Sequence, residues 1–287
     1  ITIYRKFDKL DIKTSLLGFG CMRFPTLKDG KIDETKAEQM IDLAIKNGVN
    51  YIDTAYPYHN GDSEPFLGKI LNKYPRNSYF LATKLPIWAI ENKDDVYRIF
   101  DEQLQRLETE YIDFYLLHAM NKDYFAKVKE LGIIEICEEF RKEGKIKYLG
   151  FSFHDSYEVF DEILNHYHWD FCQIQFNYMD TEIQAGLKGY ELAKAKDIPL
   201  IVMEPIKGGL LAKLPKEISM MFSQNGNRKS DSSYALRYIA SFDHVKVILS
   251  GMSTLEQVED NLDTFNNYTE LSKEEHITIA VSYTHLT

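Results

Sequence analysis

The feature of this sequence that most constrains its fold is a regular alternation of short apolar runs with amphipathic stretches. Eight runs are rich in Val, Ile, Leu, Tyr and Phe, a composition typical of parallel strands buried on both faces. They lie at 15–22, 50–55, 79–86, 111–118, 146–153, 171–177, 199–205 and 245–251. Helical periodicity follows each run, at about 35–48, 63–73, 94–107, 130–143, 155–166, 184–197, 231–242 and 254–267.

Eight strand–helix pairs in strict alternation have two main solutions, a closed barrel or an open doubly wound sheet. An open nucleotide-binding sheet is expected to carry G-x-G-x-x-G between its first strand and a helix. Here Gly18 and Gly20 lack the third glycine, and a loop containing Pro25 follows them. We therefore predict an α/β fold, a (β/α)8 TIM barrel, in which the residues before 15 form an N-terminal β-hairpin that closes the bottom.

The helix expected over 35–48 has a signal for its end and two for its start. Gly48 fits the position just past the helix end. Thr35 with Glu38 has the spacing of a capping box, and Asp33 is an alternative N-cap. No linker divides the chain, so we expect a single domain over residues 1–280, with residues 281–287 as a non-native or truncated tail in which SYTHLT continues no helical pattern.

Charge and composition exclude several classes of function. The formal net charge of −10 disfavours nucleic acid as a partner. No window approaches 18 consecutive apolar residues, which argues against a membrane span, and the N-terminus has no secretory signal pattern. The three scattered cysteines, Cys21, Cys137 and Cys172, indicate free thiols in a cytoplasmic protein rather than a disulfide framework or a metal site.

The chemistry of a barrel enzyme is expected at the carboxyl ends of its strands. Asp53 lies near the end of the second predicted strand, Tyr58 in the loop after it, Lys84 near the end of the third and His118 at the end of the fourth. Each alone has a structural alternative, such as an Asp–Lys ion bridge or a core histidine. Together at one rim, the four side chains indicate a catalytic group.

The motifs that carry these residues resemble those of the aldo-keto reductase family, over nearly the whole chain. In YIDTAYPYHNGDSEPFLGK, the family pattern matches Asp53, Tyr58, Gly61, Ser63 and Glu64. TKLP supplies Lys84 and YIDFYLLH supplies His118, at separations close to those of the family. The resemblance implies an NAD(P)H-dependent enzyme that reduces aldehydes or ketones to alcohols, with a small carbonyl compound as its substrate.

The residue types suggest how such a reduction would proceed. Tyr58 would be the general acid, although a free phenol has a pKa of about 10 and donates poorly near neutrality. Lys84, held by Asp53, would lower that pKa. His118 would donate a hydrogen bond to the carbonyl oxygen and orient it.

The resemblance also implies a cofactor site without a Rossmann motif, across the mouth of the barrel. Ser152 matches a carboxamide contact, Phe153 stands where Asn is common, and Gln175 matches a second carboxamide contact. Met203 stands where many members stack a Tyr on the nicotinamide ring, or else it is a core residue of its strand. The remaining expected contacts are Gly20, Cys21, Met22, Asp53, Glu204, Pro205, Gly208, Gly251, Ser253, Gln257, Asp260 and Asn261.

The preference between NADP(H) and NAD(H) rests on charge near the adenosine 2′-phosphate. Family members that are strongly specific for this phosphate carry Lys and Arg where this chain has Gly251 and Gln257. Lys207 or Arg228 from the preceding loop could compensate, and the Ser-x-x-x-Gln-x-x-Asp-Asn form resembles that of potassium-channel β subunits and bacterial relatives that take NADPH. We favour NADP(H), and we expect no metal in this chain.

The substrate pocket is less defined by the sequence. Phe24, Tyr56, Trp88 and His154 are plausible lining residues, each with packing as the alternative, and the segment AMNKDYFAKVKE after His118 is expected to be a loop.

Three other functional classes stay open at this point. A nicotinamide-binding sensor or regulatory subunit would not need a general acid. An electron-transfer oxidoreductase with a redox partner would need the C-x-x-C-x-x-C iron–sulfur region that similar relatives carry and that is absent here. A metal-dependent hydrolase would need a third ligand beside His118 and His154.

Overall fold

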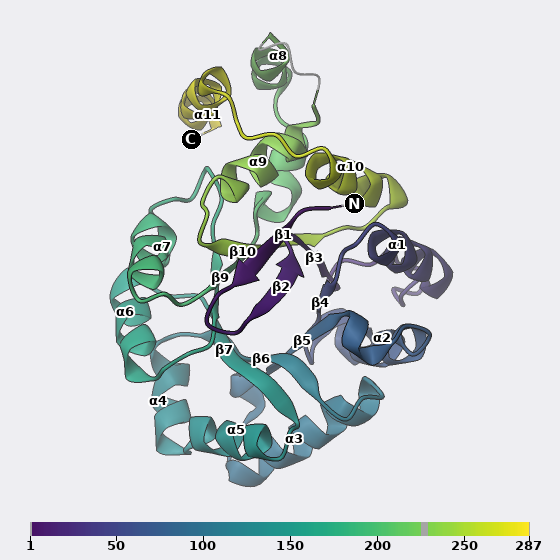
Figure 1. Cartoon of the computed structure of the whole chain (residues 1–287), viewed down its shortest axis with the longest axis vertical. Coiled ribbons are helices and arrows are strands. Elements are labelled where there is room, and N and C mark those ends of the chain that lie inside the picture. The colour runs from purple at the N-terminus through teal and green to yellow at the C-terminus, as the bar shows by residue number, and fades with distance from the viewer. Residues whose placement is uncertain (1, 225–228, 287) are drawn as a thin grey trace.

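The computed structural model describes residues 2–224 and 229–286, and within them eight parallel strands close into a barrel surrounded by helices (Figure 1). The strand order around the barrel is β10-β3-β4-β5-β6-β7-β8-β9. The strands are β3 (Leu17–Gly20), β4 (Tyr51–Asp53), β5 (Phe80–Leu85), β6 (Ile112–Met120), β7 (Ile146–Phe153), β8 (Cys172–Gln175), β9 (Leu200–Met203) and β10 (Val245–Gly251). The predicted (β/α)8 barrel is confirmed.

Each predicted helix is present close to its expected bounds. These helices are α1 (Glu34–Lys46), α2 (Ser63–Leu71), α3 (Lys93–Arg106), α5 (Ile133–Lys142), α6 (Tyr157–His166), α7 (Gly186–Ala195), α9 (Asp231–Ala240) and α10 (Leu255–Asn266). Asp33 is the N-cap of α1, because its side chain accepts a hydrogen bond from the Lys36 amide at 3.2 Å. Of the two N-caps that the sequence allows, the structure has Asp33 and not Thr35.

Three further helices were not predicted, and they correct the expectations for their segments. The stretch after His118 is not a loop, because α4 (Lys122–Glu130) begins there with Asn121 as its N-cap. A second, α8 (Lys216–Gln224), lies between β9 and α9. The third, α11 (Lys273–Leu286), contains most of the segment that was expected to continue no helical pattern.

The N-terminal hairpin closes one end of the barrel, as expected. Strands β1 (Tyr4–Phe7) and β2 (Ile12–Ser15) pair antiparallel and lie across the barrel opening in Figure 1. Phe7 is fully buried, and its ring meets Phe114 inside the barrel at a centroid distance of 5.8 Å. The amino-terminal end of the barrel is therefore filled with aromatic side chains, which leaves the opposite end for a ligand.

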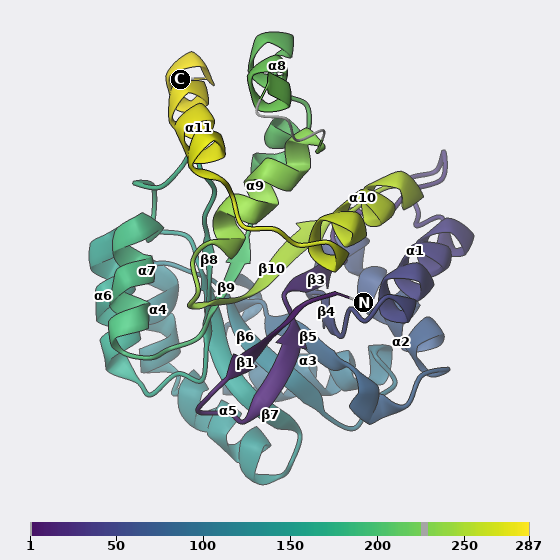
Figure 2. The same ribbon diagram turned by 45° about the horizontal axis from the view of Figure 1, so that its top comes forward.

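Helices α8 and α11 stand together at one side of the barrel (Figure 2). A buried ion pair connects α11 to α9, with Arg237 Nη1 at 2.9 Å from Glu275 Oε2. The Arg237 guanidinium also donates to the carbonyl oxygens of Thr269 and Glu270. In the described part of the chain, no helix is both long and apolar enough to cross a membrane.

Candidate active site

A cavity of about 410 Å³ opens at the carboxyl ends of the barrel strands. All four residues of the predicted catalytic group line it: Asp53 at the end of β4, Tyr58 in the following turn, Lys84 on β5 and His118 on β6. The parallel strands bring their carboxyl ends to one rim, so residues 65 positions apart in sequence share one cavity wall.

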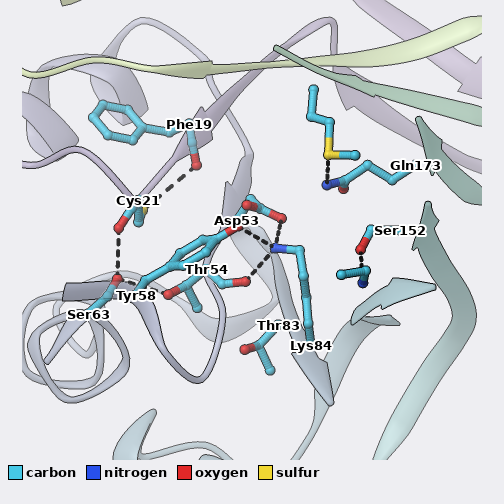
Figure 3. Close-up of polar contacts among 12 residues, drawn as sticks. Phe19, Cys21, Asp53, Thr54, Tyr58, Ser63, Thr83, Lys84, Ser152 and Gln173 are labelled. Carbon is cyan, nitrogen blue, oxygen red and sulfur yellow. Dashed lines mark hydrogen bonds and ion pairs between the residues drawn. The ribbon is translucent and has the colours of Figure 1, made fainter. Parts of the chain in front are cut away.

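Lys84 is the centre of this group (Figure 3). Its fully buried ammonium donates to Asp53 Oδ1 at 2.9 Å, to the Thr54 carbonyl oxygen at 2.7 Å and to the Tyr58 hydroxyl at 3.3 Å. An ammonium has three donors, and all three are used. Because the Tyr58 hydroxyl accepts in this bond, its own proton remains available for an oxygen in the cavity.

Tyr58 begins a tight turn, Tyr58–Gly61, that ends at the start of α2. His59 and Asn60 adopt left-handed backbone angles, with φ of 54° at both, and Gly61 follows at φ 91°. The His59 ring accepts a hydrogen bond from the Phe24 amide at 3.0 Å, which ties this turn to the loop after β3. The turn places the phenol ring of Tyr58 against the Lys84 ammonium.

The pKa of Tyr58 differs from the sequence expectation. Burial raises the pKa of the phenol, Lys84 lowers it and Asp53 raises it again, so that the net pKa lies above the usual value. The expected effect of Lys84 is present, but the expected net lowering is wrong, because desolvation of the phenolate outweighs it. The phenol therefore keeps its proton at neutral pH.

His118 faces Tyr58 across the cavity, with ring centroids 6.2 Å apart, and Trp88 stands against its other side at 5.0 Å. Burial holds the pKa of His118 well below its usual value, and the charges of Lys84 and His154 lower it further. A neutral imidazole still carries one N–H donor. Its Nδ1 atom is buried without a hydrogen-bond partner among the described residues.

Most of the residues expected to contact a cofactor line the same cavity. These are Gly20, Met22, Asp53, Ser152, Met203, Glu204, Pro205, Gly208, Gly251, Ser253 and Gln257. Ser152 is well placed to donate, because its hydroxyl accepts from the Ala119 amide at 2.7 Å and so keeps its own proton free. Ala119 has φ of 57°, next to an irregularity in the register between β6 and β7.

Five of the expected cofactor residues do not line the cavity. Cys21 and Phe153 are fully buried in the core, where Phe153 packs against Phe151 and Phe160. The amide oxygen of Gln175 accepts from Gln184 at 3.2 Å.

The other two lie on α10 and are engaged elsewhere. Asp260 accepts from the Ser230 hydroxyl at 2.7 Å, and Asn261 accepts from the Ser250 hydroxyl. These five residues lie outside the cavity wall, and their assignment as cofactor contacts stays a prediction.

Gln173 stands in the cavity wall where Gln175 was expected. Its amide nitrogen lies 3.5 Å from the sulfur of Met203, and its oxygen Oε1 is buried without a partner among the described residues. Both glutamines have the same parity on β8, so alternation alone could not tell which of the two lies at the depth of the cavity.

Two cations of the cavity wall were also missed. Arg23 and Lys213 line the cavity, and Arg23 Nη2 lies 3.6 Å from Glu204 Oε1. Lys207, which was expected to provide a cation, is instead paired with Asp180 at 3.0 Å. Arg228 lies outside the described residues.

The expected substrate-pocket residues divide into two pairs. His154 lines the cavity, and Trp88 stands beside it against His118. Phe24 is buried and stacked on His59, and the Tyr56 hydroxyl donates to Glu102 at 2.7 Å, so neither faces the cavity. Among the residues that the structure describes, no group of three or more His, Cys, Asp or Glu side chains could hold a metal ion.

Comparison with known proteins agrees with this geometry. The uncharacterized oxidoreductase YqkF of Bacillus subtilis (strain 168) is 28% identical over 91% of this chain and 90% of its own length. The glyoxal reductase of the same organism is 28% identical over 84% of this chain and 81% of its own length.

Among solved structures, the holo form of aldo-keto reductase AKR11C1 from Bacillus halodurans superposes with a TM-score of 0.81 at 29% identity, covering 98% of this chain and 96% of that one. A sequence model of the Aldo/keto reductase family matches residues 16–283. The chain therefore belongs to the Aldo/keto reductase family.

Proposed function

We propose that this protein reduces aldehydes or ketones to alcohols with a reduced nicotinamide dinucleotide, using Tyr58 as the general acid. The observation that carries the proposal is the 3.3 Å contact between the Lys84 ammonium and the Tyr58 hydroxyl in the wall of a cavity. A fully buried ammonium that donates to a half-buried phenol in a cavity wall is costly to maintain without a chemical use. This arrangement also disfavours a pure nicotinamide sensor, which needs no proton donor.

Each residue of the group has a distinct role in this proposal. Tyr58 gives its proton to the carbonyl oxygen, and Lys84 stabilises the phenolate that remains. Asp53 keeps Lys84 charged, since its attraction and that of Tyr58 outweigh the effect of burial and hold the Lys84 pKa above the usual value. His118 donates its neutral N–H to the same carbonyl oxygen and orients it. When bound in the cavity, the reduced cofactor supplies the hydride.

The cavity wall suits a nicotinamide dinucleotide. The Oε1 of Gln173, which has no partner among the residues that the structure describes, can accept from a carboxamide NH₂, and the Ser152 hydroxyl can donate to a carboxamide oxygen. Gly20 lines the cavity without a side chain, and an added Cβ there would lie 3.3 Å from the Ser250 carbonyl oxygen. Met203 would pack against the nicotinamide ring.

We infer a preference for NADP(H) over NAD(H) from the two cations of the wall, Arg23 and Lys213. The predicted adenosine-phosphate segment supplies Ser253 and Gln257, whose side chains already contact the Arg23 carbonyl oxygen and the Ser253 amide. Arginine and lysine are the residues that hold phosphate oxygens best. A reducing cytoplasm suits the three buried free thiols, Cys21, Cys137 and Cys172.

The test is a panel of small aldehydes, ketones and 2-oxoaldehydes, with glyoxal included because a relative is named for it. Each is assayed with NADPH and with NADH while the absorbance of the reduced nicotinamide is followed. We expect turnover of at least one carbonyl and a higher kcat/KM with NADPH. Cofactor binding without turnover of any carbonyl would instead support the sensor function.

A further inference from the structure

Next to the catalytic group lies a set of buried and half-buried polar side chains that the proposed reaction does not use. It consists of Glu64 on α2, Thr83 on β5, Gln103 and Arg106 on α3 and Tyr115 on β6, and we name it the Gln103 network. Glu64 and Gln103 are both fully buried. Buried polar groups of this kind destabilise a protein unless each has a hydrogen-bond partner, and each side chain of the network has one.

Gln103 connects the network to the strand that carries Lys84. Its amide nitrogen donates to the Lys84 carbonyl oxygen at 2.8 Å and to Glu64 Oε2 at 3.1 Å. Its amide oxygen accepts from the Tyr115 hydroxyl at 2.7 Å, which fixes the direction of the amide. The backbone of Lys84 is thus held by a side chain that is itself held from both sides.

The same network reaches the segment that carries Tyr58. Arg106 Nη1 donates to the Tyr56 carbonyl oxygen at 3.3 Å and to Glu64 Oε1 at 3.2 Å. Its guanidinium also lies over the Tyr56 ring, 4.3 Å from the centroid. One end of the network therefore holds the backbone two residues before Tyr58, and the other end holds the backbone of Lys84.

We propose that Gln103 is a positioning residue, which acts through Glu64 and Arg106 to set the distance between the Lys84 ammonium and the Tyr58 hydroxyl. The inference rests on the proposed function, because this distance matters only if Tyr58 transfers a proton. A misplacement of about 1 Å at a reacting group can cost about 100-fold in rate. None of the five network residues is among those that line the cavity, so the network reaches the catalytic group through the backbone carbonyl oxygens of Lys84 and Tyr56.

The test compares Gln103→Met with Gln105→Met, a matched change on the exposed face of the same helix. Gln103→Met is expected to lower kcat per bound cofactor by about 10- to 100-fold, with the Kd for NADPH unchanged. The groups facing Tyr58 are Lys84, Asp53, Cys21 and His118. Alcohol oxidation, the reverse reaction, needs Tyr58 without its proton. If only the Lys84 ammonium moves away from the Tyr58 hydroxyl, the Tyr58 pKa rises and the pH midpoint of alcohol oxidation moves to higher pH.

A merely structural role would reduce the yield or the thermal stability and leave kcat per bound cofactor and the pH midpoint at their wild-type values, which would overturn the inference. If Gln103→Met does not fold, Arg106→Met decides, with Arg98→Met as its exposed control. Lower kcat at unchanged Kd in Arg106→Met supports the inference, and unchanged kcat overturns it. A wild-type protein that reduces no carbonyl would refute the proposed function instead, so the two failures are distinguishable.

Discussion

Removing the Lys84–Asp53 ion pair, first from one side by Lys84→Met and then from both, is the change for which the structure predicts the clearest separation of stability from turnover. The Lys84 and Asp53 side chains are 1% and 4% exposed, and their charged atoms lie 2.9 Å apart. Met fills a similar volume, so packing is kept while the Asp53 carboxylate loses the ammonium. Breaking a buried ion pair from one side costs about 3–5 kcal/mol. This is an upper value, because Asp53 can take up a proton at a cost of about 1.4 kcal/mol per pKa unit.

The double variant Asp53→Asn/Lys84→Met removes both charges. Replacing a buried ion pair by neutral groups of similar volume is often neutral or stabilising, so we expect a free energy of unfolding within about 1–2 kcal/mol of wild type. The losses of stability in the two single variants, Lys84→Met and Asp53→Asn, should therefore not add, because the double variant should lose less stability than either single variant. Turnover should fall by about 100-fold or more in all three variants, because each loses the ammonium or its orientation.

The assay is urea unfolding of the wild type and the three variants at pH 7, with kcat measured on the same preparations. Stability recovered in the double variant without activity would show that the pair is retained for chemistry and not for folding. Additive losses of stability, or a double variant that turns over normally, would show that the pair is not retained for chemistry.

Three further predictions follow from the site and the fold. Reduction needs a protonated Tyr58, whose pKa is raised, and a neutral His118, whose pKa is lowered. The kcat for reduction should therefore stay constant from about pH 7 to about pH 9. A titration midpoint of kcat inside this range would contradict these two assignments. Arg23→Ala and Lys213→Ala should each raise KM for NADPH more than for NADH, as measured by steady-state kinetics, whereas equal effects would exclude a phosphate contact. Arg237→Met should lower the free energy of unfolding by about 3–5 kcal/mol, because Glu275 is left buried without its partner, and a change below about 1 kcal/mol in urea unfolding would show that α11 does not depend on this pair.

The fold could be predicted because the alternation of buried strands and amphipathic helices has few solutions. The catalytic group followed from the same reasoning, since Asp53, Lys84 and His118 stand at strand ends and parallel strands share one rim. Helix α4 was missed because Asn121, its N-cap, follows His118 by only three residues, within a stretch treated as a loop. Helix α11 was missed because its sequence has little amphipathic periodicity.

The cofactor wall was harder to predict, because it depends on depth and on neighbours distant in sequence. Gln173 and Gln175 point to the same side of β8, and only the closed barrel decides which one reaches the cavity. Arg23 lies in the loop after β3, and no local sequence pattern indicates that this loop turns toward the cavity. The predicted shift of the Tyr58 pKa had the wrong sign. The cost of burying a phenolate cannot be compared with the stabilisation of the phenolate by Lys84 until the burial of Tyr58 is known.

Tyr58 is proposed to supply the proton while contributing little to cofactor binding. The most direct test is the single-turnover rate of carbonyl reduction by Tyr58→Phe, with the Kd for NADPH measured on the same sample. We predict a rate lower by about 100- to 10,000-fold, with a Kd within about twofold of wild type. A Tyr58→Phe enzyme that turns over at the wild-type rate, or that loses NADPH binding to the same extent as turnover, would show that Tyr58 is not the general acid.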